Sequence, residues 1–165
     1  MRKTTRITWK IMLVLLGLTI TSTRVSAQEL PIIPDANKIE GTWDSQLTYK
    51  NCTTGAILFT GQSLVSYSQG GVLTAITSGA APATRSPGLG VWRHAGGHDY
   101  ESTFKEFRYN ADGTFAGKIV VVAQITHQAD DTLTTSAIGK FYNAAGVQVT
   151  SICPTGVSTR FTGEQ

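Results

Sequence analysis

The sequence places histidine and acidic side chains together at one predicted turn, and such side chains are the first requirement of a metal site. His94, His98 and Asp99 lie close together along the chain. A zinc site needs three or four donors held in tight geometry, and Gly96-Gly97 between the two histidines leaves their rings free to face apart. Because no complete ligand set is present, we predict a solvated turn and assign neither a metal nor another cofactor.

Four further side chains are candidates for contact with a ligand. His127 sits on the apolar side of an alternating segment, where it would act as a base or hydrogen-bond donor, or simply bond a backbone carbonyl. Arg85 could meet an anionic ligand bidentately, or cap a carbonyl in solvent. Tyr49 and Trp92 are either pocket walls or plain core. We take as candidate ligand-binding residues Tyr49, Arg85, Trp92 and His127, and we predict no catalytic residue.

Two glutamates, Glu101 and Glu106, lie near each other in sequence and could be taken for a pair of acid–base carboxylates. Their odd separation along a strand puts them on opposite faces of the sheet, so they cannot flank one substrate bond. The sequence also contains no nucleophile elbow, phosphate loop, zinc signature or EF-hand loop. It therefore points to no particular reaction.

Alternating apolar and polar residues predict that strands position these side chains. Trp43, Leu47 and Tyr49 alternate with polar residues, and the segment from Phe115 to His127 shows the clearest alternation. The segment from Tyr100 to Tyr109 also allows a helix. We favour a strand with a bulge near Lys105, because the next four residues read as a hairpin turn.

A hairpin pattern recurs three times: an aromatic residue, a short turn ending in glycine, and an apolar residue. It spans Tyr67–Val72, Tyr109–Phe115 and Tyr142–Val147. Consecutive hairpins at this spacing predict an all-β fold, a single antiparallel up-and-down β-barrel of about eight strands whose closure removes the sheet edges. The segment from Ser78 to Gly90 is longer than a hairpin turn requires, and we predict a functional loop there that could act as a lid.

Two motifs at opposite ends of the predicted barrel indicate a family resemblance. Gly41-Thr42-Trp43 opens the first strand, and Thr159-Arg160-Phe161 lies almost at the C-terminus. The pair resembles the signature of calycins, the lipocalin, avidin and allene-oxide-cyclase types of barrel. The resemblance implies that Arg160 lies across the Trp43 indole and closes the barrel floor together with Gly41. The chain is shorter than a lipocalin and shows no C-terminal helix pattern, so a smaller calycin-like or cyclase-type barrel fits better.

Two cysteines, Cys52 and Cys153, predict one disulfide in an exported chain; no Cys–His arrangement supports the alternative of a catalytic thiol. Pairing Trp43 with Arg160 sets one antiparallel register, and pairing Cys52 with Cys153 sets another that is shifted by only one diagonal step. Such a step keeps the paired residues on the same face of the sheet. Both pairings place the first strand antiparallel to the last, with Trp43 and Arg160 inward and the disulfide on the outer face.

Residues 1–27 read as a secretory signal peptide. Four positive residues precede an apolar run from Ile11 to Ile20, and Val25-Ser26-Ala27 is a small-x-small cleavage site. The run is short for a membrane span of about 20 residues, so we expect no span in the mature chain. Residues 28–38 would form an extended lead-in and 39–165 the barrel domain, secreted or periplasmic, from a bacterial cell.

Removal of this leader reverses the sign of the charge. The whole chain has 14 Lys and Arg against 11 Asp and Glu. Five of those positive residues belong to the leader, which leaves a small net negative charge on the mature chain. The basic isoelectric point therefore reflects export, and we expect no nucleic-acid partner.

These observations favour an exported, non-enzymatic binding barrel for a small apolar or amphipathic ligand. One alternative is a barrel enzyme of the cyclase or isomerase type, with His127, Tyr49 and Arg85 around one apolar cavity. Another is a loop-mediated interaction or inhibitor module, which an exposed apolar patch around Leu89, Val91 and Trp92 would favour.

Overall fold

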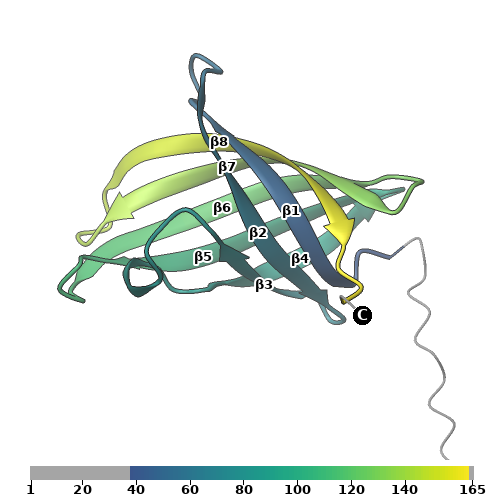
Figure 1. Ribbon diagram of the computed structural model, residues 1–165, viewed down its shortest axis with the longest axis horizontal. Helices are drawn as coiled ribbons and strands as arrows, with labels where there is room; N and C mark the ends of the chain where they lie inside the picture. Colours follow the sequence, from purple (N-terminus) through teal and green to yellow (C-terminus); the bar gives the residue numbers. More distant parts are fainter. Residues whose placement is uncertain (1–37, 164–165) are drawn as a thin grey trace, which may run out of the picture. The chain divides into compact units, whose positions relative to one another are not determined.

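The computed structural model describes residues 38–163, which fold into one closed barrel of eight antiparallel strands. Its strands are β1 (Gly41–Lys50), β2 (Ile57–Ser68), β3 (Val72–Thr77), β4 (Gly88–Gly96), β5 (Asp99–Tyr109), β6 (Phe115–His127), β7 (Thr132–Asn143) and β8 (Gln148–Arg160). Each strand pairs with the next along the chain, and β8 returns to β1 (Figure 1). The predicted up-and-down barrel is confirmed. The predicted signal peptide and all but the last residue of the predicted lead-in lie outside the described residues.

The alternation of side chains along each strand produces the barrel's inside and outside. In β6, the buried residues Ile119, Ala123 and Ile125 all lie on alternate positions of the strand, and more exposed residues lie between them. Successive side chains of a strand point to opposite faces, so one set fills the interior and the other faces outward. Among the described residues, no helix is long and apolar enough to cross a membrane.

The seam between β1 and β8 closes the barrel. Trp43 pairs with Arg160 and Lys50 with Cys153 in an unbroken antiparallel register. The disulfide between Cys52 and Cys153 is present, with 5.0 Å between their Cα atoms, which confirms the predicted bond and the predicted strand neighbours. The two cysteines are not directly opposite, because β1 ends at Lys50 and Cys52 lies in the turn that follows.

The bulge predicted near Lys105 is not there. Strand β5 pairs with β6 in constant register from Asp99 to Arg108, and the register shifts only between Arg108 and Tyr109. The inward alternation that begins at Tyr100 therefore continues without a break. It turns Glu106 into the barrel and leaves Phe107 exposed on the outside.

The long loop is shorter than predicted, because β4 already begins at Gly88. The loop contains a single 3₁₀ turn, η1 (Pro82–Thr84). It is tied to β5 by two hydrogen bonds between Ser86 and Phe107, one from each backbone amide. A side chain at Gly90 would place its Cβ only 2.1 Å from the Thr103 carbonyl oxygen, so glycine allows β4 to approach β5 closely at this point.

One end of the barrel is packed solid. The largest fully buried side chains are Trp43, Ile39, Leu73, Ile125 and Leu133. The turns β2–β3, β4–β5 and β6–β7 lie at this closed end, on the right of Figure 1. The Trp43 indole N–H donates to the Ile39 carbonyl at 2.8 Å, so the segment before β1 also plugs this end.

Candidate functional site

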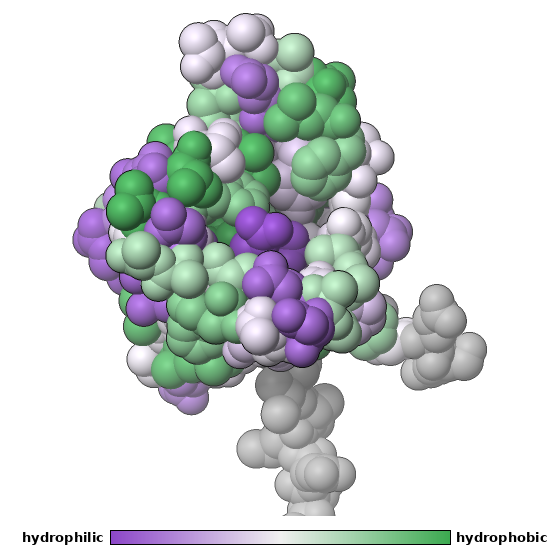
Figure 2. All heavy atoms as spheres, turned by 90° about the vertical axis from the view of Figure 1, so that its left-hand side faces the viewer, coloured by the Kyte–Doolittle hydropathy of each residue, from purple (hydrophilic) through white to green (hydrophobic). Residues whose placement is uncertain are grey.

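The barrel encloses a cavity of about 340 Å³ between the packed end and the opposite end, which we call the mouth. The hairpins β5–β6 and β7–β8 project from the mouth on the left of Figure 1. Figure 2 looks at this side and shows strongly hydrophilic atoms in the middle of the face, with apolar atoms around them. The site is therefore an internal chamber with a polar entrance.

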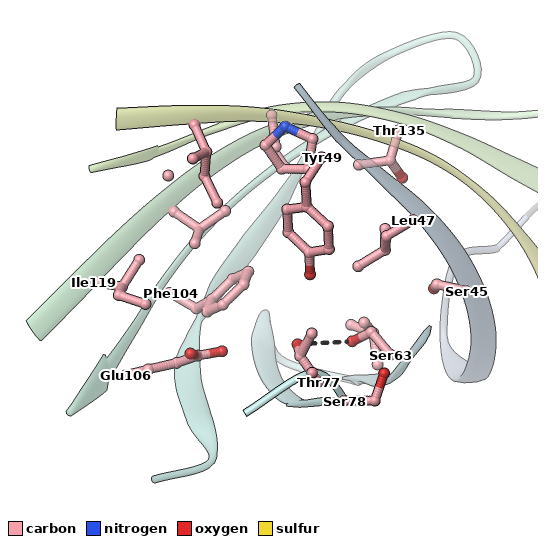
Figure 3. A pocket seen from close by; sticks show the side chains of 18 of the residues that line it. Ser45, Leu47, Tyr49, Ser63, Thr77, Ser78, Phe104, Glu106, Ile119 and Thr135 are labelled. Carbon is pink, nitrogen blue, oxygen red and sulfur yellow. Dashed lines mark hydrogen bonds between the residues drawn. The ribbon is translucent and has the colours of Figure 1, made fainter. Parts of the chain in front are cut away.

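The chamber walls are mainly apolar and come from most of the strands. The large apolar lining residues are Leu47, Phe59, Val65, Leu73, Phe104, Ile119, Val121, Phe141 and Ile152. The Tyr49 ring stacks on that of Phe59 with centroids 4.3 Å apart, and Figure 3 shows Tyr49 pointing into the chamber. Burial, opposed by the nearby Arg85, raises the pKa of the Tyr49 phenol, so it stays a neutral hydrogen-bonding group.

An ion pair lies at the mouth. Arg85 Nε, from the loop before β4, is 3.3 Å from Glu106 Oε2 on β5. The Glu106 side chain is only 4% exposed. Its burial raises the pKa of the carboxyl, and the Arg85 charge opposes that rise without cancelling it. Figure 3 shows Glu106 and Tyr49 projecting into the same space from different strands.

A second cation, Arg108, also lines the cavity at the mouth. Its guanidinium lies 5.4 Å from the centre of the Phe141 ring, a distance typical of cation–π contacts. With Glu106 ionised, the mouth therefore carries two positive charges and one negative charge.

Hydroxyl groups occupy the inner part of the chamber. Ser45 and Ser158 share a hydrogen bond of 2.7 Å, and the Thr77 hydroxyl donates to Ser63 at 3.2 Å. All four residues line the cavity, and Figure 3 shows the Ser63–Thr77 bond. The chamber thus combines apolar walls, paired neutral hydroxyls and a charged mouth.

The closed end contains a second, independent network centred on Arg160. The guanidinium donates to both carboxylate oxygens of Asp131, each at 2.8 Å, and to the carbonyls of Glu40 and Lys38. It also lies 4.2 Å from the centre of the Trp43 ring. The hydrogen bond from Arg160, helped by one from His127, lowers the pKa of Asp131 to about 2.

Gly41 has a steric reason to precede the tryptophan. Its φ is +128°, and a Cβ there would lie 2.8 Å from Arg160 Nη1. A side chain at this position would collide with the guanidinium or displace it. The structure thus brings Gly41, Trp43 and Arg160 together at the barrel floor.

The four candidate ligand-binding residues divide between the two ends. Tyr49 and Arg85 line the cavity, whereas Trp92 and His127 are not among its lining residues. Trp92 donates to the Ser68 carbonyl and packs edge-on against Tyr67. His127 bonds the Asp131 carboxylate at 2.9 Å. The three residues proposed for an enzyme therefore do not surround one cavity.

The turn predicted around His94, His98 and Asp99 is shorter than expected: His94 lies in β4 and Asp99 begins β5, so only Gly97 and His98 form the turn. His94 Nε2 lies 2.9 Å from the Gly97 carbonyl oxygen. Within residues 38–163, no group of three histidine, cysteine or acidic side chains is placed to hold a metal ion.

The sequence analysis missed Glu106 and Arg108 as cavity residues and Asp131 as the partner of Arg160. Strict alternation from Tyr100 would have found the first two, because Glu106 and Arg108 share its face. No short motif marks Asp131, which adopts a left-handed backbone conformation with φ of +57°.

Comparison with known proteins adds no relative: no protein-family model matches the chain, and no curated protein is detectably similar in sequence. The structure itself defines the class of protein as a small, disulfide-bonded, eight-stranded antiparallel barrel with an internal cavity.

Proposed function

We propose that this protein is an exported binding barrel, without enzymatic activity, that carries a small apolar or amphipathic ligand inside its lumen. The observation that supports this most directly is the cavity of about 340 Å³ with apolar walls and a polar mouth. Barrels of about eight strands are just wide enough to be filled by side chains or to hold one small ligand. Here small side chains, including Ala123 and Ala137, leave the space open.

The size and lining of the cavity favour a compact organic molecule. Ligand sites typically enclose roughly 300–1,000 Å³ and combine apolar walls with a few placed polar groups. An apolar protein cavity of about 150 Å³ can hold benzene, so a cavity of about 340 Å³ has room for a two-ring molecule.

The same features support the compartment and the family that we propose. A disulfide is stable in oxidising compartments, and the Cys52–Cys153 bond is compatible with a secreted or periplasmic protein. The contact of Arg160 with Trp43, beside Gly41, supports membership among the calycin-like barrels.

Filling the cavity tests this function. Ala137 lines the cavity, and its neighbour Ser136 is exposed on the outer face of the same strand. We expect Ala137→Leu to weaken binding of the neutral fluorescent two-ring probe 2-methylnaphthalene about tenfold or more, since overpacking a filled site costs ~1–3 kcal/mol. Ser136→Leu is the matched control and should bind as wild type does. Equal binding by all three proteins, or no binding by any, would contradict the proposal.

A second test uses the protein as purified. Native mass spectrometry of protein from its own secretory route should show an added small-molecule mass, and Ala137→Leu should lack it. Release of the ligand by solvent then allows its identification.

A cyclase or isomerase on the same scaffold is the second candidate, because Tyr49 and Arg85 do share the cavity with Glu106. A buried carboxyl of raised pKa next to a cation is a common feature of acid–base sites. Incubation of a released ligand with wild type and with Glu106→Gln, followed by NMR of the recovered molecule, separates the two functions. Conversion by wild type alone would favour the enzyme.

The third hypothesis, a loop-mediated interaction module, is less well supported. Leu89 and Val91 are exposed on β4, but Trp92 is engaged with Tyr67 and Ser68. Such a module also needs no internal cavity, whereas this barrel contains one.

A further inference from the structure

The inner wall of the cavity carries a continuous row of hydroxyl groups across four neighbouring strands. The strand register places Ser158 beside Ser45, Ser45 beside Ser63, and Ser63 beside Thr77. The row begins one inward position from the Trp43–Arg160 pair at the closed end, and its first three members are about 95% buried. Ser102 and Thr135 also line the cavity, but among residues 38–163 only these four hydroxyl residues lie side by side on neighbouring strands in this part of its wall.

The hydrogen bonds within this row leave part of its capacity unused. A hydroxyl has one donor hydrogen and two acceptor lone pairs. Ser45 and Ser158 use one hydrogen between them, as do Ser63 and Thr77. Each pair therefore keeps one O–H donor and free lone pairs for a group inside the cavity. Because each pair already satisfies itself in part, the row is stable without a ligand and still able to bind one.

The charges of the cavity lie away from the Ser45–Ser158 pair, which is the part of the row nearest the closed end, whereas Ser63 and Thr77 also line an adjoining groove together with Arg85. Among the described residues that line the cavity, the charged ones are Arg85, Glu106 and Arg108, all towards the mouth. A charged group at the inner end would lose its hydration and meet no partner charge, which is strongly unfavourable. A neutral hydroxyl or carbonyl would instead find donors and acceptors there.

We propose that the row formed by Ser45, Ser158, Ser63 and Thr77 is a subsite for an uncharged hydrogen-bonding group at the buried end of the ligand. This inference rests on the proposed binding function and narrows its ligand class to apolar molecules that enter with a hydroxyl or carbonyl end first. The apolar body of the ligand then lies against the walls, and any charged substituent stays at the mouth.

Two probes that differ by one group test the subsite: 2-naphthol and 2-methylnaphthalene, titrated at about pH 6, where a phenol is neutral. We expect wild type to bind 2-naphthol at least threefold more tightly. The double variant Ser45→Ala/Ser158→Ala removes both partners of one pair and leaves no orphaned hydroxyl. It should lose three- to tenfold in affinity for 2-naphthol, the value of one neutral hydrogen bond, and stay within twofold for 2-methylnaphthalene.

The control is the corresponding hydroxyl pair on the outer face. Thr42 and Ser66 share a 2.9 Å cross-strand hydrogen bond but do not line the cavity. Thr42→Val/Ser66→Ala should therefore change neither affinity. Thermal unfolding checks that both double variants fold; should the inner one fail, Ser45→Ala alone and the wild-type preference between the two probes still decide the question.

The outcomes separate the two proposals. If both probes bind but wild type does not prefer 2-naphthol, or the inner double variant keeps that preference, the subsite is overturned while the binding function stands. If Glu106→Gln abolishes the preference, the hydroxyl group binds at the mouth and the subsite is again overturned. If neither probe binds, the proposed function falls, and the subsite with it.

Discussion

The two ends of this barrel use the same pair of side chains, an arginine and a carboxylate beside aromatic rings, in different ways. At the closed end, Arg160 donates twice to Asp131 and also lies on the Trp43 ring. At the mouth, Arg85 makes a single contact of 3.3 Å with Glu106. The first arrangement satisfies nearly every donor of its guanidinium, whereas the second pairs one nitrogen of a guanidinium that lines the cavity.

The pKa values of the Asp131 and Glu106 carboxyls differ in the same way. Hydrogen bonds from Arg160 and His127 stabilise the ionised form of Asp131 and lower its pKa to about 2. At the mouth, burial outweighs the charge of Arg85, so the pKa of Glu106 is raised. The same kind of ionic pair is therefore extensively hydrogen-bonded at the closed end and makes only one contact at the mouth.

The largest expected effect comes from the disulfide, which fastens the β1–β8 seam towards the mouth as Arg160 fastens it at the floor. Cys52→Ser/Cys153→Ser should lower the free energy of unfolding by about 2–4 kcal/mol, because the bond closes a long loop in the unfolded chain; the two cysteines are 101 residues apart. Urea denaturation of the variant measures this loss, and urea denaturation of wild type in reducing buffer, where the disulfide is broken, should give the same loss. An unchanged midpoint in both would show that the seam does not need this bond.

The comparison of the two arginines should give the next largest effect. Arg160→Ala removes the cation–π contact and leaves acceptors at the floor unpaired, so we expect a loss of roughly 2–3 kcal/mol. Arg85→Ala leaves the buried Glu106 without its cation; because burial already raises the pKa of this carboxyl, it can neutralise by taking up a proton, and we expect a smaller loss of about 1 kcal/mol. Equal denaturation midpoints of the two variants would contradict the distinction between the ends.

Acid should weaken the closed end. A carboxyl of lowered pKa stabilises the fold above its ordinary pKa of 3.8, and this contribution is lost as the pH falls through the folded value of about 2. The Asp131 side chain is 39% exposed, so solvent weakens its interactions. We therefore expect a loss of only about 1 kcal/mol in the free energy of unfolding.

Asp131→Asn isolates this contribution. Asparagine tolerates the left-handed backbone at this position, and the variant should lose most of the stability change between about pH 4 and pH 2. Asp112, whose pKa hydrogen bonds from Thr114 also lower, titrates in wild type and variant alike. A variant with the same acid dependence as wild type would remove Asp131 from this role.

The sequence allowed more to be predicted of the closed end than of the mouth. Trp43, Arg160 and the two cysteines were enough to predict the β1–β8 seam, because antiparallel pairing fixes how distant residues face each other. Turn glycines and alternation then predicted the barrel. Asp131 was missed because its role depends on a turn conformation that no pattern of apolar residues records.

The mouth depends on a loop and on one strand of ambiguous pattern. The prediction of a bulge near Lys105 obscured the inward face of β5, and so Glu106 was not recognised as a cavity residue. The partnership of Arg85 with Glu106 could not be predicted either, because the loop that carries Arg85 reaches β5 through contacts of Ser86 with Phe107. Periodicity predicts which face a residue occupies, but not where an irregular loop lies.

Glu106→Gln gives the smallest expected effect and the clearest contrast with Asp131. The raised pKa means that the protonated carboxyl favours the folded state, and that this stability is lost as the pH rises through the folded pKa. Glutamine keeps the shape of the protonated side chain at every pH. At neutral pH the variant should therefore unfold within about 1 kcal/mol of wild type, on the stable side. As the pH is lowered towards the ordinary glutamate value, wild type should gain stability relative to the variant, opposite in sign to the Asp131 effect. Urea unfolding of both proteins across this range measures the difference. A variant as unstable at neutral pH as Arg160→Ala would show that the mouth pair is as structural as the closed-end pair.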